Sequence, residues 1–288
     1  MEVKSERTEY LFPKLIDEAC KLKEKFGAGG RFLAGGTDLL LLLDQLNEKP
    51  KALIDINRIP ELKTFTISDS LVTIGAAVTY NEILENNELC QQLPFLEKAI
   101  RSIGGVQVRN MATLVGNIAN ASPAGDSLPA LYVLKAKVCT TDGTNQREIA
   151  IEDFILGVRK INLKPNELIS HIKFKLPKPA FHGEFEKIGL RKAMAISLVS
   201  LALLISLDEL KIDEIYIALG SVAPTVVNVG GLDAIIGKPL NQKTIAEIVA
   251  IAANNAKPID DVRGSAEYRR MAITGMVKRS LNKFIDKN

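Results

Sequence analysis

Two glycine-rich segments in the first half of the chain constrain its fold and its ligand more than any other feature. The longer segment runs from Arg109 to Asp126, and the shorter one runs from Leu33 to Leu39, roughly eighty residues earlier. Both consist mainly of small residues, glycines and short hydroxyl or amide side chains. This composition suits a loop whose backbone N–H groups approach an anionic cofactor closely. Together the two segments predict one extended ligand that is held from two sides.

The composition excludes several classes of protein. A chain of 288 residues is long enough for about two domains. Its 47% hydrophobic and 25% charged residues are typical of a soluble globular protein, and a net charge of +3 without tryptophan does not favour nucleic-acid binding. The polar start, residues 1–7, is unlike a signal peptide, and the longest apolar run, residues 196–207, is far shorter than the roughly 20 residues that span a bilayer. We therefore expect a cytoplasmic protein without a transmembrane segment.

The few cysteines and histidines limit the chemistry that the side chains can carry. Cys20, Cys90 and Cys139 are widely spaced and form no CxxC pair. A cysteine-ligated iron–sulfur cluster needs about four thiolates, so we expect neither a cluster nor a zinc site nor a disulfide framework. His171 and His182 are the only histidines. We predict no metal and no catalytic side chain, so a cofactor must supply any chemistry.

Apolar periodicity and turn-forming residues predict an α+β fold, because strands and helices do not alternate regularly. Expected helices cover residues 13–26, 39–46, 81–85, 94–103, 127–134, 244–254 and 265–283. Expected strands cover residues 32–34, 52–56, 64–67, 71–74, 137–141, 146–151, 168–176, 185–189, 197–207 and 214–220. The longer glycine-rich segment is expected to be a loop. The breaker run 177–179 predicts a boundary between residues 1–176, themselves in two parts of about 1–58 and 59–176, and residues 177–288.

In the shorter segment, Gly35 and Gly36 stand between a predicted strand and a predicted helix. Their amides, with those of Thr37 and Asp38, can form an anion nest that fits a pyrophosphate. The Asp38 carboxylate would repel phosphate, so we expect its side chain to turn away, either to cap the helix or to accept a hydrogen bond from a ribose. The alternative is a plain strand–turn–helix corner that needs glycine only for its backbone conformation.

In the longer segment, Thr113 offers a hydroxyl, Gly116 an accessible amide and Asn117 an amide side chain. Asp126 either holds a sugar hydroxyl or caps the next helix, and the residues alone favour capping. A nanomolar cofactor requires about 12 kcal/mol of binding free energy, whereas one hydrogen bond to a charged group contributes roughly 1.5–3 kcal/mol. Many modest contacts are needed, and two long segments can supply them.

Six stretches resemble the FAD-binding medium subunit of molybdenum hydroxylases, a family that includes the carbon monoxide dehydrogenase medium subunit and the xanthine dehydrogenase FAD-binding subunit. They are residues 34–39, 108–113, 116–126, 187–197, 220–225 and 263–270. They follow the expected order and span nearly the whole chain. The resemblance implies a two-part FAD-binding domain of the vanillyl-alcohol-oxidase/MurB (PCMH) type, followed by a smaller α+β C-terminal domain.

The resemblance also implies which residues bind FAD. The turn from Ala34 to Leu39 would hold the pyrophosphate, while Thr113, Gly116 and Asn117 would form a second grip on the phosphate side. Asp126 would contact the sugar or ribityl hydroxyls.

At the ring end, Ile103 and Gly104 match positions that cover the isoalloxazine. Ile169 matches an apolar contact near the edge of the ring. Lys187 matches a polar contact that would stabilise negative charge on reduced flavin; the alternative is a solvated surface lysine.

One residue departs from the family pattern. Relatives usually have two glycines where this chain reads Val115-Gly116. Valine adopts a positive φ only with strain, so we expect extended backbone at Val115 and an isopropyl group that points away from the cofactor. On this basis the chain is expected to retain FAD less tightly than its relatives.

The resemblance implies an electron-transfer subunit. A flavin joins one-electron iron–sulfur clusters to an acceptor such as NAD or quinone. Because the chain lacks the thiolates for clusters and a recognisable molybdopterin site, we expect a hetero-oligomer with a molybdopterin-containing large subunit and a [2Fe–2S] small subunit. The alternatives are a self-sufficient flavin oxidoreductase of the same superfamily and a flavin-free structural or assembly subunit.

Overall fold

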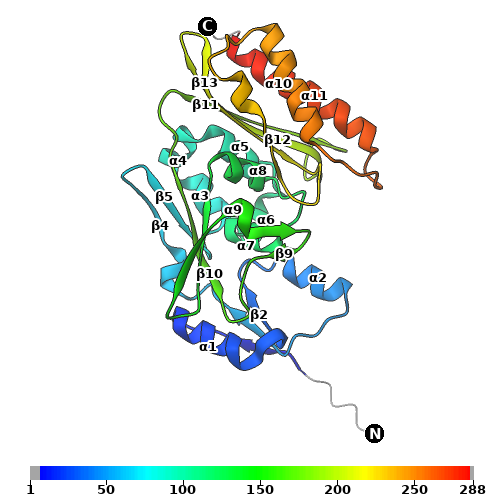
Figure 1. Ribbon diagram of the computed structural model, residues 1–288. Helices are drawn as coiled ribbons and strands as arrows, with labels where there is room; N and C mark the ends of the chain where they lie inside the picture. Colours follow the sequence, from blue (N-terminus) through cyan, green and yellow to red (C-terminus); the bar gives the residue numbers. More distant parts are fainter. Residues whose placement is uncertain (1–6, 286–288) are drawn as a thin grey trace.

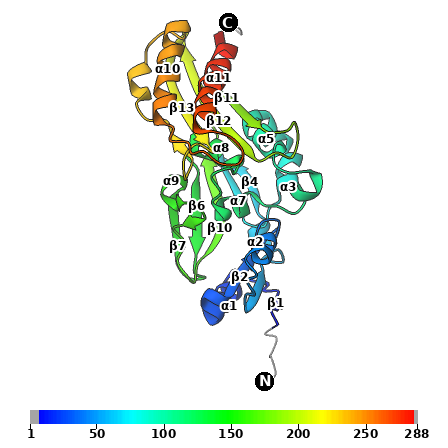
Figure 2. The same cartoon turned by 90° about the vertical axis from the view of Figure 1, so that its right-hand side faces the viewer.

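Three β-sheets follow one another along the length of the molecule (Figure 1). The computed structural model describes residues 7–285. A three-stranded sheet lies at the N-terminal end, a five-stranded sheet in the middle and a four-stranded sheet at the C-terminal end (Figure 2). Residues 1–6, which carry most of the argument against a signal peptide, lie outside the described range. The α+β prediction is confirmed.

The first sheet is parallel and has the order β1-β3-β2. Its strands are β1 (Glu9–Leu11), β2 (Gly30–Leu33) and β3 (Ala52–Asp55), and its helices are α1 (Ile16–Phe26) and α2 (Leu39–Gln45). The predicted helix stop is confirmed, because Gly27 ends α1 with a φ of 51°. Ala19 and Cys20 on α1 are buried, so this helix closes one side of the small sheet.

The second sheet is antiparallel and has the order β4-β5-β10-β6-β7. Its strands are β4 (Phe65–Ser68), β5 (Leu71–Gly75), β6 (Lys137–Thr141), β7 (Gln146–Ala150) and β10 (Leu168–Lys175), with a separate hairpin of β8 (Ile155–Gly157) and β9 (Lys160–Ile161). The helices are α3 (Tyr80–Glu85), α4 (Asn87–Gln92), α5 (Pro94–Arg101), α6 (Val106–Arg109), α7 (Leu114–Asn120), α8 (Ser127–Val133) and α9 (Ile151–Phe154). Both predicted hairpins are present, and β10 joins them. The long loop expected over residues 109–126 is wrong, because α7 occupies its middle.

The third sheet is antiparallel and has the order β11-β12-β13-β14. Its strands are β11 (Phe181–Gly189), β12 (Ser197–Asp208), β13 (Lys211–Gly220) and β14 (Val227–Asn228), followed by α10 (Gln242–Asn255) and α11 (Ala266–Ile285). The apolar run on β12 is explained by burial on both faces. Ala202 and Leu204 belong to the core shared with α5 and α8, whereas Leu201 and Leu203 belong to the core under α10 and α11.

The proline-containing segment 177–179 connects the second sheet to the third. We keep it as the proposed boundary between the two domains. Within residues 7–285, no helix combines the length and apolarity that crossing a membrane requires.

A buried carboxylate fixes α11 to the third sheet. Glu186 on β11 accepts hydrogen bonds from the Arg279 guanidinium and, at 3.0 Å, from Lys283 Nζ. Desolvation acts to raise the pKa of Glu186, but these cations outweigh it and hold the pKa below its usual range. A carboxylate with a lowered folded-state pKa stabilises the fold above its unfolded-state pKa and loses that contribution as the pH falls through the folded-state value.

We predict that Glu186→Gln lowers the free energy of unfolding at neutral pH by about 2 kcal/mol, between the values for surface and buried ion pairs. The variant should also lose less stability than the native chain between about pH 5 and pH 3, because the titrating group is gone. Thermal unfolding across this range measures both effects. Glu247→Gln, which breaks the exposed Lys238–Glu247 pair, is the control and should change stability far less.

Candidate functional site

The turn between β2 and α2 contains four consecutive backbone N–H groups without a hydrogen-bond acceptor in the described structure. The amide N–H groups of Gly35, Gly36, Thr37 and Asp38 find no acceptor in the described part of the chain. Gly36 has a φ of +70°, which favours glycine. Asn57 Nδ2 donates to the carbonyl oxygen of Ala34 at 2.9 Å and so holds the start of the turn. Neighbouring amides of this kind form a cradle for an anion.

Asp38 precedes Leu39, the first residue of α2, but its side chain makes no capping hydrogen bond. Of the two roles expected for this side chain, capping of the helix is therefore wrong. Asp38 is exposed; partial desolvation raises the pKa of its carboxyl, and the positive charge of Arg159 acts in the opposite direction. The carboxylate remains available for a polar ligand group.

The two glycine-rich segments meet through their backbones. A Cβ atom at Gly35 would lie 2.0 Å from the carbonyl oxygen of Met111 and 2.8 Å from the Cα of Ala112. No residue with a side chain fits there unless the segments separate. The next residue along the second segment is Thr113, so the structure brings the two predicted phosphate grips together.

Thr113 is buried and caps α7, since its Oγ1 accepts a hydrogen bond from the Gly116 N–H at 2.9 Å. The Gly116 amide is therefore not open to a ligand, contrary to expectation. Asn117 is the third member of this grip, and its Oδ1 accepts a hydrogen bond from Ser127 Oγ at 2.9 Å. Its Nδ2 has no partner among residues 7–285 and remains a free donor.

The expectation of extended backbone at Val115 is wrong. Val115 is the second residue of α7, and its side chain is buried in the core of the N-terminal domain. A helix requires negative φ, which valine adopts without strain. The predicted reason for weak FAD retention is thereby removed.

At the other end of the site, Asp126 and Lys187 form an ion pair across the two domains. Lys187 Nζ lies 2.5 Å from Asp126 Oδ2 and 3.0 Å from the carbonyl oxygen of Ser102, and Ser197 Oγ also donates to Asp126. Burial raises the pKa of the Asp126 carboxyl, while the charge and hydrogen bond of Lys187 act against that rise. Asp126 makes no side-chain cap of α8, so the favoured capping prediction is wrong. Lys187 is only 13% exposed, which excludes a solvated surface lysine.

Gly104 takes a φ of +52°, and Arg109 Nη1 donates to the carbonyl oxygens of Ile103 at 2.9 Å and Gly104 at 3.2 Å. This turn borders a hollow of about 320 Å³ between the domains. The hollow is lined by Lys98, Arg101, Ser102, Gly104, Phe185, Lys187, Gly189, Arg191, Lys192, Ala193, Met194 and Ala195. Two of the predicted ring-end residues, Gly104 and Lys187, therefore share one concave surface. Ile169 does not line it but is buried on β10.

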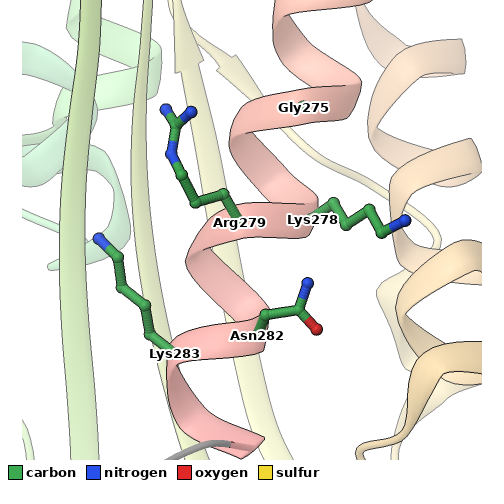
Figure 3. Close-up of a pocket in the computed structure, with 5 residues that line it drawn as sticks. All are labelled: Gly275, Lys278, Arg279, Asn282 and Lys283. Atoms are coloured by element: carbon green, nitrogen blue, oxygen red, sulfur yellow. The ribbon is translucent and has the colours of Figure 1, made fainter.

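A second, more open hollow of about 340 Å³ lies along α11 and contains none of the predicted cofactor residues (Figure 3). Its Arg279 and Lys283 point toward β11, where they pair with Glu186, and we assign it no ligand. In the part of the chain that the structure describes, no group of three or more His, Cys, Asp or Glu side chains could hold a metal ion.

Several residues that support the site were not identified from the sequence. Asn57, Arg109, Ser127 and Ser197 hold, respectively, the first turn, the Gly104 turn, Asn117 and Asp126. Arg109 and Ser127 stand in or beside the longer glycine-rich segment, so their position was a usable signal. Asn57 and Ser197 act across long sequence separations, which no local pattern indicates.

We predict that Val115→Gly destabilises the chain without improving its grip on FAD. Loss of a buried valine and introduction of glycine into a helix should together lower the free energy of unfolding by about 3 kcal/mol. Thermal unfolding and a fluorescence titration with FAD measure the two effects. Val115→Ala, which keeps the helix propensity, should lose less stability; FAD binding that tightens more than fivefold in Val115→Gly would restore the original expectation.

Comparison with known proteins agrees with this geometry. The family described as FAD binding domain in molybdopterin dehydrogenase matches residues 5–179, and the CO dehydrogenase flavoprotein C-terminal domain matches residues 185–284. The chain is 32% identical over 278 residues to the carbon monoxide dehydrogenase medium chain of Hydrogenophaga pseudoflava, covering 96% of each chain. It is 30% identical over 259 residues to the xanthine dehydrogenase FAD-binding subunit of Escherichia coli O157:H7, covering 88% of each.

A solved structure of the Hydrogenophaga pseudoflava carbon monoxide dehydrogenase, in a form that lacks the Mo-pyranopterin moiety of its molybdenum cofactor, superposes with a TM-score of 0.91 at 31% identity, covering 96% of each chain. Both domains and their order are therefore shared with these proteins. The chain belongs to the family of FAD-binding medium subunits of molybdenum hydroxylases.

Proposed function

We propose that this subunit grips the FAD pyrophosphate between its two glycine-rich segments and the flavin ring between its two domains. The observation that carries the proposal is the row of four free amides at residues 35–38, placed against the backbone of the second segment. The free Nδ2 of Asn117 and the Thr37 hydroxyl add neutral donors, which suit a phosphate. The donors present therefore fit the phosphate end of FAD.

At the ring end, the residues favour a flavin that exchanges electrons over one that reacts with an organic substrate. Bound FAD supplies one- and two-electron redox chemistry. Ile103 and Gly104 would cover the ring, and Asp126 would accept hydrogen bonds from the ribityl hydroxyls. Lys187 would place an ammonium near the ring, with part of its charge already neutralised by Asp126.

We further propose that a molybdopterin-containing large subunit supplies electrons to the iron–sulfur clusters of a [2Fe–2S] small subunit. From these clusters the electrons would pass to the flavin, and from the flavin to NAD or quinone. His171 lies beside Ser170 on β10, and His182 lies near Phe284 in the C-terminal domain. Neither histidine lines the hollow between the domains. A self-sufficient oxidoreductase would need acid–base groups there. The flavin-free alternative has lost its support, because Val115 is helical and buried.

Reconstitution tests this function directly. The purified chain should bind FAD in a one-to-one ratio, read by visible absorbance, and the flavin should be bleached by substrate only when the other two subunits are present. Oxidation of an organic substrate by the isolated, FAD-loaded chain would contradict the electron-transfer role. Failure to bind FAD at all would contradict the cofactor assignment.

We predict that Thr37→Val leaves stability unchanged and weakens FAD binding about tenfold, because the hydroxyl has no partner among the described residues and one hydrogen bond to phosphate is lost. Gly35→Ala should weaken binding more, since it forces the two segments apart. Fluorescence titration with FAD gives both dissociation constants. Gly275→Ala on α11, where a Cβ meets nothing within 4 Å, is the matched control and should bind FAD normally.

A further inference from the structure

A buried chain of three hydrogen-bonding side chains leads from α3 to the phosphate grip. Tyr80 OH lies 3.3 Å from Ser127 Oγ, and Ser127 Oγ lies 2.9 Å from Asn117 Oδ1. Tyr80 is 1% exposed and Ser127 is fully buried, whereas Asn117, the last of the three side chains, is half-buried. No ligand role explains the first two residues, so their hydroxyls must act through the third.

The number of hydrogens fixes the direction of these bonds. A phenol has one hydrogen to donate, and within residues 7–285 Ser127 is the only hydrogen-bond partner of Tyr80 OH. A buried phenol left without an acceptor is unfavourable, so Ser127 Oγ accepts from Tyr80. The single Ser127 hydrogen then points onward, and Asn117 must receive it with its carbonyl oxygen. Burial raises the pKa of Tyr80, so the phenol keeps its proton at neutral pH.

The direction of these hydrogen bonds decides which end of the Asn117 amide faces Ser127 and which end faces away from it. The two ends of an amide are nearly equal in shape, so packing alone does not distinguish them. With Oδ1 bound to Ser127, the Nδ2 group and its two hydrogens are directed away from the buried chain. Gly125 leaves room for this end of the amide, because a Cβ there would come within 2.8 Å of Asn117 Oδ1 and displace it.

We propose that Tyr80 and Ser127 are positioning residues that lock Asn117 with its NH₂ group toward the FAD pyrophosphate. The inference rests on the proposed function, since it assumes that FAD binds at this grip. In the locked orientation Asn117 donates to phosphate, whereas the reversed amide would place a carbonyl oxygen against a negative charge.

The test is a double-mutant cycle on the full chain, with FAD itself as the probe. Ser127→Ala should raise the dissociation constant of FAD about fivefold, because Asn117 regains rotational and flip freedom. In an Asn117→Ala background the same substitution should change it less than twofold, since no amide remains to be oriented. A purely structural role of Ser127 would give the same fold-change in both backgrounds, and that result would overturn the proposal.

Ser280→Ala is the matched control. Ser280 is a fully buried serine on α11 whose hydroxyl has no partner in the described structure, so its loss should leave FAD affinity unchanged. FAD binding by the native chain distinguishes failure of the proposed function from failure of the orienting role. If the native chain binds no FAD, the proposed function fails; if it binds FAD and Ser127→Ala binds equally well, only the orienting role fails.

Tyr80→Phe is a second test of the Asn117 orientation, for use if Ser127→Ala does not fold. Without the phenol hydrogen, Ser127 can either donate to or accept from Asn117, and two equally populated orientations would halve the competent fraction and double the dissociation constant. The side-chain amide NMR signal of Asn117, identified by its loss in Asn117→Ala, should also shift when FAD is added to the native chain. An amide signal that FAD leaves unchanged would overturn the proposal.

Discussion

The backbone contact between Gly35 and Met111 joins two sheets that, within residues 7–285, share no hydrogen-bonded strand. The first sheet is parallel and local, whereas the second is antiparallel and is closed by β10. Because Gly35 has no Cβ, the turn after β2 can lie directly on the segment that leads into α7. The free amides of this turn thereby lie against the segment that leads into α7, the helix that carries Asn117. The proposed phosphate grip is a property of this junction and of neither sheet alone.

The second domain completes the site through charges that would be unfavourable if separated. Asp126 and Lys187 are both largely buried, and a buried charge without a partner is strongly destabilising. The Ser197 hydroxyl and the Ser102 carbonyl satisfy further hydrogen bonds of the pair. Docking of the third sheet onto α5 and α8 therefore fixes the electrostatics of the ring end. In the proposed site, Lys187 would therefore not act on a flavin as an isolated positive charge.

The elements that local patterns define were predictable from the sequence, and those that depend on distant partners were not. The hairpins 64–74 and 137–151 and the long strand β12 follow from alternation, turn residues and apolar runs. The helix α7 was missed because its glycine was interpreted as loop-forming, although Thr113, three residues before Gly116, is a usable capping signal. Asp126 was assigned to a helix cap because its true partner, Lys187, is 61 residues away in another domain. The family resemblance located these residues, but only the structure shows that they bind each other.

The two ends of the site are built by different means, and they should respond differently to change. Backbone amides, fixed by glycine geometry at residues 35 and 36, make most of the proposed phosphate end. Side chains from both domains make the proposed ring end, where the exposed residues 191–194 form part of the wall. Loosening of the interface between domains would therefore alter the surroundings of the ring while the phosphate grip persists. In the proposed site, affinity for the nucleotide and tuning of the flavin would in this way be separable properties of one chain.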